Sequence, residues 1–311
     1  MIWARTLAAE TRGEPMKDTF EGYHPAITFV YFGMMFAGVL TMTHPLAQAV
    51  SLVCGLSYAV QQERHGAVRF ALKFCLPMLL LTAIINPAFS HEGVTILTYL
   101  PTGNPLTLES ILYGLSAGTM LACALLWFRN FNRVISSDKF VYLFGRILPV
   151  LSLVLSMTLR FVPKFKGQLA AVAQGQRSIG RDVSRGGLWS RTKTAITILS
   201  VTVTWAMENA IETADSMKSR GYGLPGRTAF SIYRFDRRDR DMLFWLGFCG
   251  LYLLAGRVAH GFDFRYFPSI RAAELTPISC AVYLVYLALC ITPVVINIRE
   301  EKLWNSTLSK M

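Results

Sequence analysis

Two arginines stand in similar local surroundings, and their chemistry suits contact with another protein. The two triplets are Gln176, Arg177, Ser178 and Ser219, Arg220, Gly221. A guanidinium group is planar and donates several hydrogen bonds at once to carboxylates or backbone carbonyls, which a lysine ammonium cannot reproduce. A single arginine at a helix C-terminus is ordinary, because the helix dipole favours it by about 0.3 to 1 kcal/mol. Two such ends favour a pair of docking tips over a simple packing feature.

Two long amphipathic helices are predicted to carry these triplets. The first begins at Pro163 and ends at Gly180, a typical C-cap glycine, because its apolar residues recur every three or four positions. The second runs from about Thr192 to Gly221. Its apolar stripe consists of Ile196, Leu199, Val203, Met207, Ala210, Ala214 and Met217.

Acidic residues follow another face of the second helix. Glu208, Glu212 and Asp215 recur at helical spacing. Beside a cationic partner helix, Asp215 would clamp the two helices together. An ordinary solvated face explains the same pattern equally well, so both interpretations stay open.

The positive charge of the chain is concentrated around these helices. Residues 160–240 hold 15 of the 31 Lys and Arg residues and a net charge of +9, out of +12 for the whole chain. An excess of Lys and Arg beside membrane spans marks the cytoplasmic side. We therefore expect this block on the cytoplasmic side. Membrane topology explains the basic charge, so nucleic-acid binding is not needed to explain it.

The composition indicates an all-α, polytopic integral membrane protein. The 311 residues are 53% hydrophobic and only 16% charged, and the mean hydropathy is +0.39. Apolar windows long enough to cross a bilayer lie at 70–90, 110–128, 242–259 and 275–297. The apolar tract 26–60 is too long for one crossing, so we predict a hairpin of two short spans that turns at His44 and Pro45.

A further apolar run, 140–162, is predicted not to cross, because both of its flanks are cationic. That leaves about six spans with both termini in the cytoplasm, at the cell membrane. The predicted division is 1–24, a cytoplasmic N-terminal segment; 25–128, the first four spans; 129–241, cytoplasmic or interfacial helices; 242–298, the last two spans; and 299–311, a cytoplasmic tail.

No pattern typical of a catalytic, cofactor or metal site is found. The sequence contains no phosphate-binding loop of the form G-x-x-x-x-G-K-[ST] and no H-E-x-x-H motif. The five histidines are scattered, which favours structural roles. The six cysteines fall in or beside apolar runs without metal-ligand spacing, and we expect them to be buried thiols.

Two stretches resemble the transmembrane (T) component of energy-coupling factor (ECF) transporters, of the vitamin or cobalt/nickel type. Residues 155–163, LSMTLRFVP, resemble the family stretch SLALRFIP, and residues 214–222, ADSMKSRGY, resemble ADAMESRGY. The resemblance covers most of the chain and is densest from about 138 to 223. The arginine triplets match the family's X-Arg-X coupling motifs, and Gln176 and Ser178 depart from the commoner Ala-Arg-Gly form.

The resemblance implies a non-catalytic scaffold of an ABC-type importer. Two cytoplasmic ATPase subunits, which bind ATP and Mg, would dock on the arginine tips of the coupling helices. A separate membrane protein, the S component, would bind the vitamin or metal ion. The chain itself would hold no cofactor.

Two other classes of function compete with this interpretation. A secondary transporter with its own substrate site would show internal repeats and ionisable residues at the membrane midplane. No clear repeat is found, and the spans hold few charges. A multipass membrane enzyme would need convergent His, Asp, Glu or Cys groups at one membrane face, and none stands above background.

The prediction that 140–162 does not cross is testable by cysteine accessibility. In a chain without native cysteines, Ser137→Cys and Lys166→Cys should both be labelled only from the cytoplasmic side, because both flanks are cationic. Labelling of either position from outside intact cells would exclude the six-span arrangement.

Overall fold

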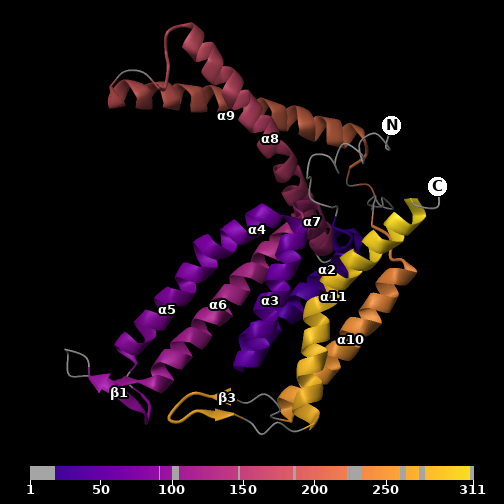
Figure 1. Ribbon diagram of the computed structural model, residues 1–311. Helices are drawn as coiled ribbons and strands as arrows, with labels where there is room; N and C mark the ends of the chain where they lie inside the picture. Colours follow the sequence, from indigo (N-terminus) through magenta and orange to yellow (C-terminus); the bar gives the residue numbers. More distant parts are fainter. Residues whose placement is uncertain are drawn as a thin grey trace. The chain divides into compact units, whose positions relative to one another are not determined.

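The computed structural model describes residues 18–90, 92–99, 105–145, 148–184, 187–222, 224, 233–259, 264–272 and 277–308 (Figure 1). The chain divides into two compact units. Met1–Ser136 and Tyr233–Met311 form one, here called the bundle unit, and Ser137–Ile232 form the other, called the crossed-helix unit. Most of the predicted N-terminal segment 1–24 lies outside the described residues.

The bundle unit is helical, with two short β pairs in its connections. Its elements are η1 (Phe20–Gly22), α2 (Pro25–Thr41), α3 (Pro45–Gln62), α4 (Arg64–Phe70), the π-helical η2 (Ala71–Cys75), α5 (Leu76–Phe89), β1 (Ile96–Tyr99), β2 (Pro105–Thr107), α6 (Leu108–Val134), α10 (Arg237–Val258), β3 (Phe264–Arg265), β4 (Arg271–Ala272) and α11 (Pro277–Leu308). The antiparallel pairs β1–β2 and β3–β4 were not predicted.

Among the described residues, four helical segments are long and apolar enough to cross a membrane. They are Arg64–Phe89, Leu108–Val134, Arg237–Val258 and Ser279–Trp304, and they coincide with the four predicted windows. None of them falls within 137–178. The prediction of an all-α membrane protein is confirmed, and six as the number of spans stays a prediction.

The predicted break at His44 and Pro45 is found as the boundary between two helices, α2 and α3, whereas a hairpin of two short membrane spans stays a prediction. Each helix begins with the same pair of residues, a histidine followed by proline. The Nδ1 atom of His24 accepts a hydrogen bond from the Ala26 N–H (3.3 Å), and His44 Nδ1 accepts one from the Leu46 N–H (3.2 Å). Each imidazole satisfies a helix-terminal donor, while the proline that follows has no N–H to satisfy.

Aromatic side chains fill the core of the bundle unit, and two glycines leave space for them because they lack a Cβ atom. The largest fully buried side chains include Trp127, Tyr31 and Tyr286. A Cβ atom on Gly38 would lie 2.8 Å from the Tyr286 ring, and one on Gly55 would lie 3.2 Å from Trp127 Nε1. Close helix approach through small residues is typical of membrane bundles.

Five of the six cysteines are buried, as predicted, and Cys280 is exposed. The prediction was wrong for Cys280 because an apolar run indicates immersion in the membrane. It does not indicate which side of a helix faces protein and which faces lipid.

A hydrogen-bond network around Asp18 ties the N-terminal segment to two helices. Asp18 Oδ2 accepts hydrogen bonds from the Tyr58 hydroxyl (2.6 Å) and from Gln62 Nε2 (2.9 Å), both on α3. Asp18 Oδ1 accepts one from Asn297 Nδ2 on α11 (2.9 Å). The amide oxygen of Asn297 in turn accepts the backbone N–H of Thr19 (3.1 Å).

In the crossed-helix unit, the described helices are α7 (Ser137–Gly145), α8 (Pro149–Ser178) and α9 (Leu188–Ser219). The prediction that a helix starts at Pro163 was wrong, because α8 begins at Pro149 and continues through Pro163. Both prolines are compatible with a first helical position. The apolar residues before Pro163 propagate the helix from the earlier one.

We predict that Asp18→Ala destabilises the bundle unit. The substitution leaves buried donors on Tyr58, Gln62 and Asn297 without their acceptor, which should cost on the order of 3 kcal/mol. Thermal unfolding of the purified chain in detergent measures this loss. Asp241→Ala is the matched control, because the Asp241 side chain is 74% exposed and lies 3.8 Å from Arg240. Equal melting temperatures for the two variants would contradict the prediction.

Candidate protein-docking site

Helices α8 and α9 cross each other (Figure 1), and four side chains make the contacts described here. Lys164 Nζ on α8 donates a hydrogen bond to Asn209 Oδ1 on α9 (2.9 Å). The same ammonium lies 5.4 Å from the centre of the Trp205 ring. Phe165 meets Trp205 edge to face, with ring centroids 5.8 Å apart. Hydrogen bonding, cation–π attraction and aromatic packing therefore converge on one point of each helix.

The two arginine triplets lie well beyond this crossing. Arg177 lies about 18 Å along α8 from Phe165, and Arg220 lies about 22 Å along α9 from Trp205. Figure 1 shows the ends of α8 and α9 on different arms of the cross. The structure therefore presents the two triplets as separate tips.

The end of α8 is closed by a complete Schellman motif. The Gly180 N–H donates to the Arg177 carbonyl (3.0 Å), and the Arg181 N–H donates to the Gln176 carbonyl (2.9 Å). Gly180 has a φ of +80°, a left-handed conformation that favours glycine. The predicted C-cap role of Gly180 is confirmed.

The end of α9 repeats the same hydrogen-bond pattern. The Gly221 N–H donates to the Lys218 carbonyl (2.9 Å), and the Tyr222 N–H donates to the Met217 carbonyl (3.0 Å). Gly221 has a φ of +73°. Relative to these caps, however, the arginines are offset by two positions, because Arg177 is the penultimate residue of α8 and Arg220 follows the last residue of α9. Sequence reasoning matched the two ends and missed this offset.

Arg177 is oriented by an acid in the loop that follows it. Its Nε donates to Asp182 Oδ1 (3.1 Å), which also accepts the Ser184 N–H (3.0 Å). These contacts, the Ser184 N–H first, hold the pKa of Asp182 below its usual value. Because the folded pKa is lowered, the contacts are intact above the usual aspartate range and are lost as the pH falls through the lowered pKa. The Arg177 side chain remains 63% exposed.

The serines beside the arginines bond to their own helices. Ser178 Oγ donates to the Gln174 carbonyl (3.1 Å), and Ser219 Oγ donates to the Ser216 carbonyl (2.9 Å). Arg220 is exposed. In each triplet the arginine is therefore the cationic group presented to a partner, while the serine helps to satisfy the helix end.

The predicted clamp residue, Asp215, is exposed on α9. The inter-helix hydrogen bond found among the described residues is made by Asn209, nearly two turns earlier. The clamp role of Asp215 stays a prediction. Asn209 and Trp205, which join the helices, were not singled out from the sequence, because neither belongs to the apolar stripe or to the charged face.

The apolar stripe predicted on α9 is turned outward. Ile196, Leu199, Val203 and Met207 have exposed fractions between 48% and 66%. The residues of α9 that are buried are Thr194, Ile198 and Thr202, spaced by four residues on another face. The stripe is thus available to a partner or to lipid.

Curated homologues carry one name, energy-coupling factor transporter transmembrane protein EcfT. The protein of Lactobacillus helveticus is 34% identical over 106 residues, which are 33% of this chain and 38% of that protein. EcfT 1 of Listeria monocytogenes is 26% identical over 229 residues, 68% of this chain and 82% of that protein. The protein of Exiguobacterium sibiricum is 24% identical over 244 residues, 74% of this chain and 91% of that protein.

The chain is a homologue of the EcfT proteins. The 34% match to the Lactobacillus helveticus protein spans less than two fifths of that protein's length, whereas the more divergent matches cover most of theirs. No protein-family model matches the chain. The resemblance to the transmembrane component of ECF transporters is confirmed, and the vitamin or cobalt/nickel type stays a prediction.

We predict that Trp205→Ala loosens the crossing of α8 and α9. The substitution removes both the Phe165 contact and the ring beneath Lys164, which should cost on the order of 2 kcal/mol at this half-buried position. Spin labels at Gln174→Cys and Lys218→Cys, in a chain without native cysteines, report the distance between the arms. The distance distribution should broaden. Trp189→Ala is the control, because Trp189 is on the same helix and is 86% exposed; equal broadening in both variants would contradict the prediction.

Proposed function

We propose that the chain is the membrane scaffold and coupling subunit of an ECF-type ABC importer. It would link two cytoplasmic ATPase subunits to a separate, substrate-binding S component that takes up a vitamin or metal ion. The observation that carries the proposal is the crossed pair α8–α9, whose two capped ends each present an exposed arginine about 20 Å from a shared contact.

The capped ends suit docking to the ATPase subunits. Each Schellman motif fixes the backbone of the tip, so little conformational entropy is lost when the arginine is bound. A guanidinium group reaching an acidic groove can bond carboxylates and backbone carbonyls together. Two tips on two arms give one contact for each of two ATPase subunits.

The exposed stripe on α9 suits the S component. Ile196, Leu199, Val203 and Met207 present apolar side chains that water does not favour. A membrane protein offers a matching apolar surface. The crossing at Trp205 lies within the length of this stripe, between Val203 and Met207, so movement of the tips would be carried to the S component through a rigid contact.

The proposed chain is non-catalytic and holds no cofactor. ATP and Mg would be bound by the ATPase subunits, in agreement with the absence of a phosphate-binding loop from the full sequence. The proposed location is the cell membrane, with both termini in the cytoplasm, as the cationic block 160–240 favours.

The test is charge reversal at the two tips. Arg177→Glu and Arg220→Glu replace attraction to an acidic groove by repulsion, and loss of one partner of a desolvated charge pair typically costs about 2 to 5 kcal/mol. The double variant should lose co-purification with the ATPase subunits or lose substrate uptake, and each single variant should be weakened. Arg181→Glu, an exposed position beside the first tip, is the control.

The bundle unit should be unaffected, because exposed substitutions usually change stability by less than about 0.5 kcal/mol. Membrane insertion and melting temperature of the double variant should therefore equal those of the unsubstituted chain. A double variant that assembles with the ATPase subunits and transports normally would overturn the assignment of the tips.

A further inference from the structure

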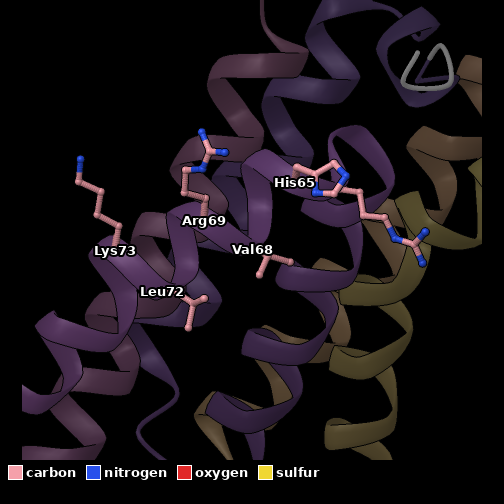
Figure 2. A pocket seen from close by; sticks show the side chains of 6 residues that line it. His65, Val68, Arg69, Leu72 and Lys73 are labelled. Carbon is pink, nitrogen blue, oxygen red and sulfur yellow. The ribbon is translucent and has the colours of Figure 1, made fainter. Parts of the chain in front are cut away.

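A shallow pocket of about 610 Å³ lies at the start of the first candidate span in the bundle unit. It is lined by Arg64, His65, Val68, Arg69, Leu72 and Lys73. Figure 2 shows Arg69 and Lys73 projecting on one side and His65 on the other, with Val68 and Leu72 between them. The pocket thus combines cationic groups with an apolar floor.

One continuous helix supplies all six side chains. α4, η2 and α5 follow one another without a break from Arg64 to Phe89, and the lining residues recur at intervals of four, which places them in two neighbouring rows along the helix. The π-helical segment Ala71–Cys75 includes two of them, Leu72 and Lys73. Single π-helical turns are frequent at functional sites.

The pocket lies at the level of the lipid headgroups. A helix of 26 residues is about 39 Å long, whereas the hydrocarbon core of a bilayer is about 30 Å thick. No Lys, Arg, Asp or Glu occurs in 74–89, so this part of the helix lies in the hydrocarbon core. The part of the helix that extends beyond the core is its cationic end. Lys73, the deepest cation, reaches the headgroup layer by extending its side chain.

The pocket opens toward lipid. Val68 is 46% exposed and Leu72 is 60% exposed, and only 6% of the apolar window of this span is buried inside the protein. The α5 part of the helix packs mainly on α6, and the α4 part contacts α3. In a membrane, acyl chains would therefore lie against Val68 and Leu72.

The acid next to the pocket is already paired elsewhere. Glu63 Oε2 accepts hydrogen bonds from Arg133 Nη1 (2.6 Å) and Arg129 Nη2 (3.3 Å), both on α6. The charges of Arg64, Arg69 and Lys73 are therefore not balanced by Glu63. Among the described residues no ion pair is formed by Arg64, Arg69 or Lys73, so their positive charge is available to attract a phosphate group.

We propose that this pocket binds an anionic glycerophospholipid. Arg69 and Lys73, which project on one side, hold the headgroup phosphate, Arg64 adds positive charge nearby, and Val68 and Leu72 contact the upper acyl chain. A lipid fits better than a soluble phosphate compound, because only a lipid places its phosphate and an apolar chain against the two kinds of side chain together. This inference is independent of the proposed transport function.

The experiment compares lipid binding to the full chain and to two charge-matched variants. The pocket variant is Arg64→Gln, Arg69→Gln and Lys73→Gln. The control is Arg240→Gln, Arg299→Gln and Lys302→Gln, three exposed cations of α10 and α11 that remove the same charge. Retention of phosphatidylglycerol and of phosphatidylcholine is measured by native mass spectrometry of the detergent-purified protein across a lipid titration.

Each cation near a membrane surface contributes about a fivefold gain in binding, so the pocket variant should bind phosphatidylglycerol on the order of 100-fold more weakly. The control should change by less than about threefold, and phosphatidylcholine should bind weakly throughout. An equal loss in the control, or equal binding of the two lipids to the unsubstituted chain, would overturn the proposal.

Competition distinguishes a lipid from a soluble anion. Glycerol phosphate and inorganic phosphate should displace phosphatidylglycerol only at concentrations far above that of the lipid. Displacement at equal concentration would identify a soluble-phosphate site and refute the lipid assignment. If the triple variant fails to insert, Arg69→Gln alone should show a loss of about fivefold, and an unchanged affinity of this single variant would count against the proposal.

Discussion

The arrangement of the two arginine-bearing helix ends depends on one contact, the crossing of α8 and α9. Lys164, Trp205 and Asn209 join helices that are each about 45 Å long. A rotation of about 10° at this point would move a tip 20 Å away by roughly 3.5 Å. The direct hydrogen bond and the ring contacts restrict such rotation, because neither tolerates large changes in angle. A motion imposed on one helix is therefore expected to turn both helices together, without a change in the angle between them.

The buried face of α9 is unusual because it carries threonines, while apolar side chains are exposed. Thr194 and Thr202 on the buried face of α9 donate their hydroxyl hydrogens to the carbonyls of Ser190 and Ile198 in their own helix (3.0 and 2.8 Å). A satisfied hydroxyl presents its methyl group to a neighbour at little cost. This allows the apolar stripe of α9 to lie outside. An apolar surface of that extent in water promotes association with lipid or with another protein.

Sequence reasoning located most helices and both helix ends, because hydropathy, helical spacing and C-cap glycines are local signals. His44 and Pro45 marked the boundary between α2 and α3, and Gly180 marked the end of α8. The start of α8 was misplaced at Pro163, because two prolines gave the same signal. The outward stripe of α9 and the pairing of Trp205 with Phe165 depend on which faces meet in three dimensions, and spacing within one helix does not specify that.

The basic end of the bundle unit follows from contacts between helices as well as from composition. Arg129 on α6 is only 14% exposed, and it lies 5.6 Å from the Phe70 ring and bonds to Glu63. A largely buried guanidinium is costly without such partners, so this contact marks the level at which both helices leave the apolar core. The charge-free length of α6 precedes Arg129, and that of the neighbouring helix follows Lys73, about one turn deeper than Phe70. The helix Arg64–Phe89 and α6 thus indicate the same membrane boundary to within about one helical turn. The excess of Lys and Arg there favours the cytoplasmic face. Because α6 ends on this side, the chain leaves the bundle unit at its basic end.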